Sequence, residues 1–195
     1  EEIKHVEGTG IPIRGNNIDT DRIIPARFLK AITFDGLGDH AFEDDRKSMP
    51  GHPFSNPAFS HATVLFANEN FGSGSSREHA PQALYRSGIR AIVGGSFAEI
   101  FAGNCLVMGL PLVTSDRVSE WQDRLKVEPH VPVSVDLVER TIMLGDDAYP
   151  IEMQEAARRS LISGTWDSTA ALLIGEEEIA SAESRIPYLQ WRRKS

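Results

Sequence analysis

Apolar residues fall into short runs along the chain, and the length and spacing of each run predict an element. The runs "ATVLFA" (62–67) and "IRAIVGG" (89–95) are almost entirely apolar and short, as buried strands are. Between them, "SSREHAPQALYRSG" predicts a helix with a serine at its N-cap and Gly88 at its C-terminal end. A strand, a helix and a strand of these lengths predict a βαβ unit with parallel strands.

The rest of the chain predicts further short elements. Segment 131–153 alternates apolar and polar residues and breaks at a Gly-Asp-Asp triplet, which is typical of antiparallel strands. Residues 30–60 are rich in Gly, Pro, Asp and His and predict a long irregular excursion. The other expected elements are strands at 11–14 and 110–115 and helices at 97–104, 115–125, 153–164 and, as one or two turns, 168–186. We therefore expect an α/β protein with a mixed sheet.

Composition narrows the functional classes. The chain of 195 residues has a net charge of −8, so it lacks the basic footprint of a nucleic-acid-binding protein apart from "WRRKS" at its end. Its one cysteine, Cys105, makes no intramolecular disulfide and cannot alone hold an iron–sulfur cluster or a structural zinc. No apolar run approaches the roughly 18 residues of a membrane span, and the first residues resemble no signal peptide. We expect a cytoplasmic protein that binds no metal.

The stretch "NFGSGSSREHAPQAL" (70–84) is the first candidate site, because it follows a strand and opens a helix. Ligands of open α/β sheets gather beyond the carboxyl ends of strands, and a helix N-terminus favours anions. Gly72 and Gly74 allow a ligand close to the backbone, and Arg77 has the planar fork that matches a carboxylate or phosphate. A capped helix preceded by a glycine turn explains the same residues. A P-loop and a hydrolase elbow are excluded by spacing.

Other polar residues are weaker evidence for a functional site. Asp19 and Asp21 lie two apart in a loop, where they could cap a turn, bind a cation or pair with an arginine; capping is the commonest use. The six histidines have no metal-ligand spacing. His79 is more typical of a structural hydrogen-bonding residue than of a proton shuttle, and a buried, inert thiol is the default for Cys105.

Three segments occur together in this order: "NIDTDRIIPARFLK" (17–30), "NFGSGSSREHAPQAL" (70–84) and "SFAEIFAGNCLVMGLPLV" (96–113). With them the chain resembles the small subunits of 3-isopropylmalate dehydratase, the swivel-domain members of the aconitase superfamily, over essentially its whole length. The resemblance implies a β/β/α swivel domain with a mixed, partly barrel-like sheet and flanking helices. It also implies that residues 1–195 form a single domain with a helical tail from about residue 153.

The resemblance further implies a hydro-lyase of leucine biosynthesis that acts only with a large subunit. That partner carries a [4Fe–4S] cluster, one iron of which is the Lewis acid for the leaving hydroxyl of a small dicarboxylate substrate. No cofactor is expected on this chain. By the family's motif, Ser75 is the base that takes the substrate proton, and Gly74, Ser76 and Arg77 bind substrate carboxylate.

Two further sets of residues follow from the resemblance. Asp19 and Asp21 belong to an Asp-Thr-Asp motif near the active-site interface, where Asp21 is expected to orient Arg77 or partner residues; His79 is expected to support the same site. The segment after this motif matches the loop that selects the substrate's side group, and it contains Leu29, Ile32 and Phe34. Apolar residues there suit an isopropyl group, although core packing explains them equally well.

The segment 28–38, "FLKAITFDGLG", differs from the "T-R-T-G-F-G" pattern of some relatives, which leaves the choice of substrate open. A citraconate, methylmalate or homoaconitate hydratase subunit is therefore an alternative. A stand-alone anion-binding module is a second alternative. The loop within residues 70–84, here called the Gly-Ser loop, needs no partner to bind a carboxylate.

Overall fold

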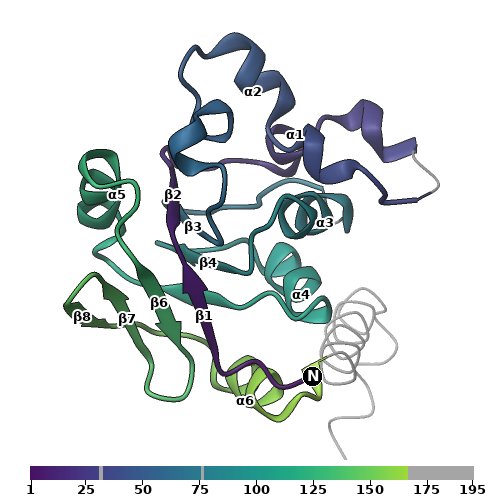
Figure 1. Ribbon diagram of the computed structural model, residues 1–195. Coiled ribbons are helices and arrows are strands. Elements are labelled where there is room, and N and C mark those ends of the chain that lie inside the picture. The colour runs from purple at the N-terminus through teal and green to yellow at the C-terminus, as the bar shows by residue number, and fades with distance from the viewer. Residues whose placement is uncertain (31–32, 76, 167–195) are drawn as a thin grey trace, which may run out of the picture.

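The computed structural model describes residues 1–30, 33–75 and 77–166, which contain two four-stranded sheets (Figure 1). All strand pairs of the first sheet are parallel, in the order β2-β3-β4-β5. All pairs of the second are antiparallel, in the order β1-β6-β7-β8. Strands of both directions are thus present, as predicted, but they are divided between two sheets.

The parallel sheet contains the predicted βαβ unit. Its central strands are apolar at every position, because each is covered on both faces. Ile11 pairs with Leu65, and Leu65 pairs with Ile92, so neighbouring strands end at the same edge. The strands are β2 (Gly10–Ile13), β3 (Val64–Ala67), β4 (Ala91–Gly94) and β5 (Leu112–Thr114).

The antiparallel sheet arises from the alternating segment 131–153. Val133 and Val135 are buried while their neighbours Ser134 and Asp136 are half-buried, which is the period of a one-sided sheet. The first strand was not predicted, because only one of its four residues is buried and no apolar pattern marks it. The strands are β1 (His5–Gly8), β6 (Val133–Asp136), β7 (Thr141–Leu144) and β8 (Asp147–Pro150).

Helices cover the predicted positions with shifted ends. The predicted serine N-cap is wrong: α3 begins at His79, and Glu78 occupies the cap position without a side-chain capping bond. The segment that precedes it is held in a loop by hydrogen bonds to another part of the chain. The helix predicted at 153–164 ends at Ser163 and is followed by Gly164 in the left-handed conformation. The main helices are α3 (His79–Arg86), α4 (Glu99–Val107), α5 (Val118–Val127) and α6 (Glu155–Ser163).

Two hydrophobic cores lie on the two faces of the parallel sheet. Leu65 and Ala67 of β3 face a core that includes α3, α4 and the excursion. Val64 and Phe66 face the other core, which is shared with α5, α6 and the antiparallel sheet. The parallel sheet therefore lies between a layer of helices and the antiparallel sheet (Figure 1). The predicted α/β class with flanking helices is confirmed.

The excursion at 30–60 was predicted to be irregular, but it contains the short helix α2 (Glu43–Ser48) and the 3₁₀ turns Leu37–His40, Pro53–Ser55 and Pro57–Phe59. Helix α1 (Thr20–Ile23) and the 3₁₀ turn Ala26–Lys30 come before it in the connection from β2 to β3. Phe42 is fully buried, and Arg27 donates to Glu43 and Asp44, so apolar and ionic contacts both hold this segment. His40 and Arg27 lower the pKa of Glu43 to about 2, because both hydrogen-bond its carboxylate.

The predicted helical turns at 168–186 and most of the predicted tail lie outside the described residues. That residues 1–195 form one swivel domain stays a prediction.

Candidate active site

Three loops meet beyond the carboxyl ends of the parallel strands. They follow β2, β3 and β4 and comprise residues 14–19, 68–78 and 95–98. The second loop pairs with both others, through isolated bridges of Ser73 with Asp19 and of Phe71 with Phe97. This edge is where α/β sheets bind ligands, and it holds the Gly-Ser loop predicted as the site.

Three hydrogen bonds join the Gly-Ser loop to the Asp-Thr-Asp motif and to Ile18, the residue before it. Gly72 N donates to the Ile18 carbonyl at 2.8 Å, and Thr20 N donates to the Ser73 carbonyl at 2.8 Å. Ser75 N donates to Thr20 Oγ1 at 3.1 Å. Two motifs that are more than 50 residues apart in sequence therefore form one local structure. The motifs alone did not predict this contact.

A polar network on the other side of the loop was missed in the sequence. Ser96 Oγ donates to Glu69 Oε2 at 2.7 Å and accepts from Asn70 N at 2.8 Å. Asn70 Nδ2 donates to Asn17 Oδ1 at 3.0 Å. Both asparagines have positive φ, near 55°, which this residue type tolerates better than most. The asparagines at 16–17 and at 68 and 70 were the sequence feature that could have indicated this network.

The proposed base and carboxylate ligand lie on the exposed side of this loop. Ser75 and Arg77 are both exposed, and Gly74 beside them is also exposed. No described carboxylate forms an ion pair with Arg77 within residues 1–30, 33–75 and 77–166, so its guanidinium fork is open to an anion. Ser76 lies outside the described residues. The catalytic roles of these residues stay predictions.

The two acids of the Asp-Thr-Asp motif have different surroundings. Asp19 is the N-cap of α1, and its Oδ1 accepts from Arg22 N at 2.9 Å, which confirms the capping interpretation. Asp21 is exposed, and in the described structure it makes no hydrogen bond or ion pair with Arg77. Its orienting role therefore stays a prediction.

His79 connects the Gly-Ser loop with the segment predicted to select substrate. Its ring packs edge-on against Phe34, with 5.1 Å between ring centroids. Its Nδ1 is buried and has no hydrogen-bond partner among the described residues, and the supporting role expected of His79 stays a prediction. Phe34 and Leu29 are half-buried, and Phe34 also packs against the first core, which supports the core-packing alternative. Ile32 lies outside the described residues.

Comparison with known proteins identifies the family. The model of the aconitase C-terminal domain matches residues 1–117. The 3-isopropylmalate dehydratase small subunit of Synechocystis is 45% identical over 194 residues, which cover 98% of this chain and 97% of that protein. The small subunit of Thermus thermophilus is 42% identical, with 96% of each chain covered. This chain belongs to the family of 3-isopropylmalate dehydratase small subunits.

A solved member of this family has the same fold. The 3-isopropylmalate dehydratase structure from Methanocaldococcus jannaschii superimposes with a TM-score of 0.68 and 25% sequence identity. The alignment covers 92% of this chain and 99% of that chain. The family and the fold predicted from the three segments are therefore confirmed.

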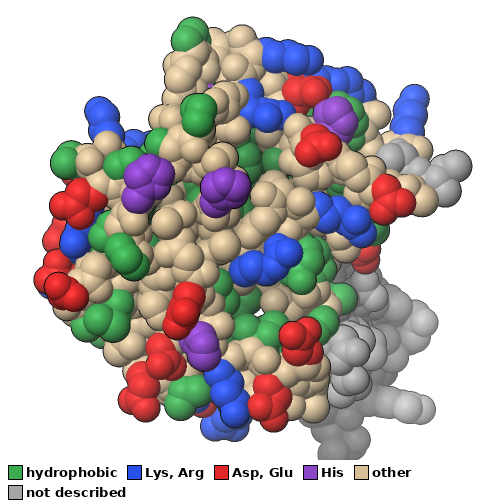
Figure 2. Space-filling model, in the orientation of Figure 1, with side chains coloured by type: hydrophobic (Ala, Val, Ile, Leu, Met, Phe, Trp, Pro, Cys, Tyr) green, Lys and Arg blue, Asp and Glu red, His purple; other side chains and the backbone are tan. Residues whose placement is uncertain are grey.

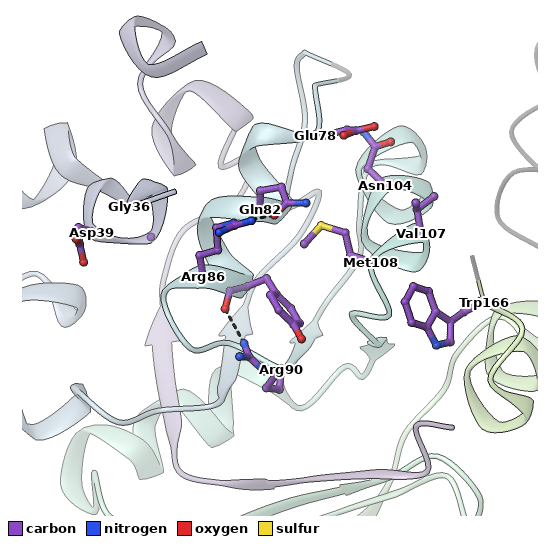
Figure 3. A pocket seen from close by; sticks show the side chains of 12 residues that line it. Gly36, Asp39, Glu78, Gln82, Arg86, Arg90, Asn104, Val107, Met108 and Trp166 are labelled. Carbon is purple, nitrogen blue, oxygen red and sulfur yellow. Dashed lines mark hydrogen bonds between the residues drawn. The ribbon is translucent and has the colours of Figure 1, made fainter. Parts of the chain in front are cut away.

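A cavity in this chain lies beside the Gly-Ser loop rather than in it. It has a volume of about 660 Å³ and lies between α3, α4 and the 3₁₀ turn Leu37–His40 (Figure 3). Large cavities are the usual first candidates for ligand sites. However, Ser75 and Arg77 do not line it, whereas Glu78 does.

The arginines of this cavity already have partners. Arg86 donates to Gln82 and pairs with Asp35, and Arg90 donates to the backbone carbonyl of Tyr85 (Figure 3). The guanidinium of Arg90 also lies 3.9 Å from the centroid of the Tyr85 ring. Arg86 and Arg90 thus have partners within the fold, whereas Arg77 forms no ion pair with the residues that the structure describes. We therefore retain the Gly-Ser loop as the candidate active site.

The described side chains do not suit an iron–sulfur cluster. Within the described part of the chain, no three His, Cys, Asp or Glu residues form a group that could hold a metal ion. Cys105 is fully buried in α4, and burial raises the pKa of its thiol well above the ordinary value, which agrees with an inert core residue.

The surface of the small subunit carries charges of both signs. Figure 2 shows basic and acidic side chains interspersed over one face, without a large patch of one sign. No helix in residues 1–30, 33–75 or 77–166 has the length and apolar character needed to cross a membrane.

Proposed function

We propose that this chain is the small subunit of a 3-isopropylmalate dehydratase, a hydro-lyase of leucine biosynthesis that is active only with its large subunit. The family assignment supports the reaction, and the open guanidinium of Arg77 beside Ser75 supports the location of the site. The enzyme would interconvert 2- and 3-isopropylmalate by dehydration to an alkene and rehydration. A cytoplasmic location is part of the same proposal.

Ser75 takes the proton from substrate carbon in this proposal. A serine hydroxyl is a weak base, and its alkoxide requires stabilisation by positive charge and N–H donors in a closed site. Arg77 lies two residues away, and the loop leads into the N-terminus of α3, whose first N–H groups lack helical partners. Closure by the large subunit would exclude water and strengthen these interactions.

Arg77 holds a substrate carboxylate, and Gly74 allows that carboxylate close to the backbone. The planar guanidinium can make two parallel hydrogen bonds, which fix orientation as well as position. Ser76 is the second carboxylate ligand in this proposal. The [4Fe–4S] cluster belongs on the large subunit, where it would supply a Lewis acid for the leaving hydroxyl.

Reconstitution of the two subunits tests this function. The full chain, either wild type or Ser75→Ala, is mixed anaerobically with a cluster-loaded large subunit, and alkene absorbance is followed from 3-isopropylmalate. We expect turnover by wild type and a loss of at least about 100-fold in Ser75→Ala, while the exposed-serine control Ser55→Ala stays active.

Substrate and binding controls separate the alternatives. Turnover of citraconate, methylmalate or homoaconitate in place of isopropylmalate would keep the hydro-lyase assignment and change the substrate. Association of the two chains without turnover of any of these acids would contradict the enzyme assignment. Binding of a dicarboxylate by the isolated chain would then favour the anion-binding module.

A further inference from the structure

The backbone of the Gly-Ser loop is held by one side chain near the proposed base. Two of its three bonds to residues 18–20, those of Gly72 and Ser73, join backbone atoms and are independent of residue type. The third is different, because the acceptor for Ser75 N is the hydroxyl oxygen of Thr20. Thr20 thus contributes the side-chain contact closest to the residue that we assign as the base.

Thr20 is itself held rigidly. Its side chain is buried, with 5% of the residue exposed, and its β-branched side chain has few rotamers. It is the first residue of α1, which is capped by Asp19 and closed by the bond from Ile24 N to the Thr20 carbonyl. Phe42 N, from the buried part of the excursion, donates to the Ile23 carbonyl at 2.8 Å. The Thr20 hydroxyl therefore has a fixed position.

The loop has little else that would fix Ser75. Gly74 has φ of +98°, in the region that glycine enters readily, and both Gly74 and Ser75 are exposed. The three atoms nearest to a Cβ built on Gly74 belong to Thr20 and Asp19 and lie 3.4 Å or more away. Apolar packing thus cannot set the backbone at this point, and the hydrogen bond to Thr20 can.

We propose that Thr20 is a positioning residue, whose hydroxyl accepts the Ser75 N–H and so orients the Ser75 side chain toward the substrate. This inference rests on the proposed role of Ser75 as the base. Thr20 contacts neither substrate nor cofactor in this proposal. It acts through the backbone of Ser75, and misplacement of a reacting group by about 1 Å can cost roughly 100-fold in rate.

Two substitutions separate the hydroxyl from the shape of the side chain. Thr20→Val keeps the volume and β-branching and removes the acceptor, whereas Thr20→Ser keeps the acceptor and removes a methyl group. Because Ser75 is exposed, water can accept its N–H in Thr20→Val, and we expect that variant to fold. Thr20→Ala, which cannot overpack the site, is a second variant without the hydroxyl.

Steady-state kinetics of the reconstituted enzyme provide the first test. We expect Thr20→Val and Thr20→Ala to lower kcat by about 10- to 100-fold with KM within about threefold of wild type, and Thr20→Ser to restore at least a third of kcat. Thr63→Val is the matched control, because Thr63 also uses its hydroxyl in a hydrogen bond, to the Glu7 carbonyl at the opposite end of β3. Wild-type kcat in Thr20→Val would overturn the proposal.

Amide hydrogen exchange in the full chain provides a second readout that does not depend on activity. We expect the Ser75 amide to be protected in wild type and Thr20→Ser and to exchange at least about tenfold faster in Thr20→Val, while core amides of β3 are unchanged. An unprotected Ser75 amide in wild type would overturn the inference. Full activity of Ser75→Ala would instead overturn the proposed base, and the Ser75 exchange data would still report on the contact with Thr20.

Discussion

Phe101 of α4 fills the space in which a side chain at Gly72 would lie. A Cβ built on Gly72 would be 2.2 Å from Cγ of the Phe101 ring. Phe101 in turn packs edge-on against the buried Phe71, with 5.5 Å between ring centroids. The Gly-Ser loop thus begins at a closely packed point and continues into the open backbone around Gly74.

Alanine at the two glycines is expected to have different effects. Both have positive φ, so each substitution strains the backbone, by roughly 1–2 kcal/mol. Gly72→Ala also overlaps with the Phe101 ring, and we expect it to lower the free energy of unfolding by about 2 kcal/mol or more. Gly74→Ala has no such overlap, and we expect it to lower turnover more than stability. Chemical denaturation and the reconstituted assay measure the two effects; equal destabilisation by both variants would contradict this reasoning.

Arg77→Lys keeps the positive charge and removes the planar fork. We expect a loss of about 100-fold in kcat/KM with 3-isopropylmalate, because a lysine cannot orient the carboxylate by two parallel bonds. Arg159→Lys, on the exposed side of α6, is the control for a change of arginine to lysine elsewhere. Near-normal turnover of Arg77→Lys would rule out the proposed clamp.

Gln122 of α5 satisfies backbone groups at the carboxyl ends of two parallel strands. Its buried Nε2 donates to the carbonyls of Phe66 and Ile13, and its amide pairs with that of Asn68. Gln122→Leu leaves these groups without a partner, so we expect a loss of about 1–3 kcal/mol in the free energy of unfolding. Gln154→Leu, at an exposed position, is expected to change it by less than about 0.5 kcal/mol in the same denaturation experiment.

The segment that contains Phe34 is predicted to select the substrate side group. We expect Phe34→Ala to raise KM for 3-isopropylmalate by about 10-fold and to change KM for citraconate, which has a smaller side group, by less than about threefold. Core packing alone predicts a different result, in which the melting temperature falls and both KM values change together. The ratio of the two KM values therefore distinguishes substrate contact from packing.

His52 makes stability depend on pH. It is buried, and burial lowers the pKa of its imidazole; its Nδ1 also accepts from Phe54 N, a bond that protonation would remove. Below about pH 6.5 the unfolded chain binds a proton that the folded chain resists, so the free energy of unfolding falls as pH decreases through this range.

His52→Asn tests this dependence, because asparagine retains a capping acceptor for Phe54 N and does not titrate. We expect the fall in melting temperature between pH 7.5 and 5 to be smaller in His52→Asn than in wild type. His61→Asn, at an exposed histidine, is expected to leave the wild-type fall unchanged. Identical pH dependence in wild type and His52→Asn would exclude this origin.

The sequence was sufficient for most of the parallel layer. Runs such as Val64–Ala67 are apolar at every position because both faces of the strand are covered, and that pattern is visible without a structure. β1 was missed because Val6 is its one buried residue, so its pairing partner β6 rather than its own pattern determines it. Strand direction was predictable from connection length, but the division into two sheets was not, since it depends on which faces pack together.

The sequence predicted which residues form the candidate site better than it predicted the contacts between them. The capping role of Asp19 depends on neighbours in sequence and was foreseen. The bond from Ser75 N to Thr20 Oγ1 and the pairing of Ser96 with Glu69 join residues from different strand ends. Only the register of the parallel sheet brings them together, and local patterns contain no information about that register.

The bonds between Thr20 and the loop at Ser73 and Ser75 have a consequence for folding. They span about 55 residues of chain, and β2 must pair with β3 before the two segments can meet. Closing so long a loop has an entropic cost that local contacts cannot offset, and long-range pairing is slow. The Gly-Ser loop should therefore become ordered late in folding, and in a peptide that contains only the βαβ unit this loop should not be ordered.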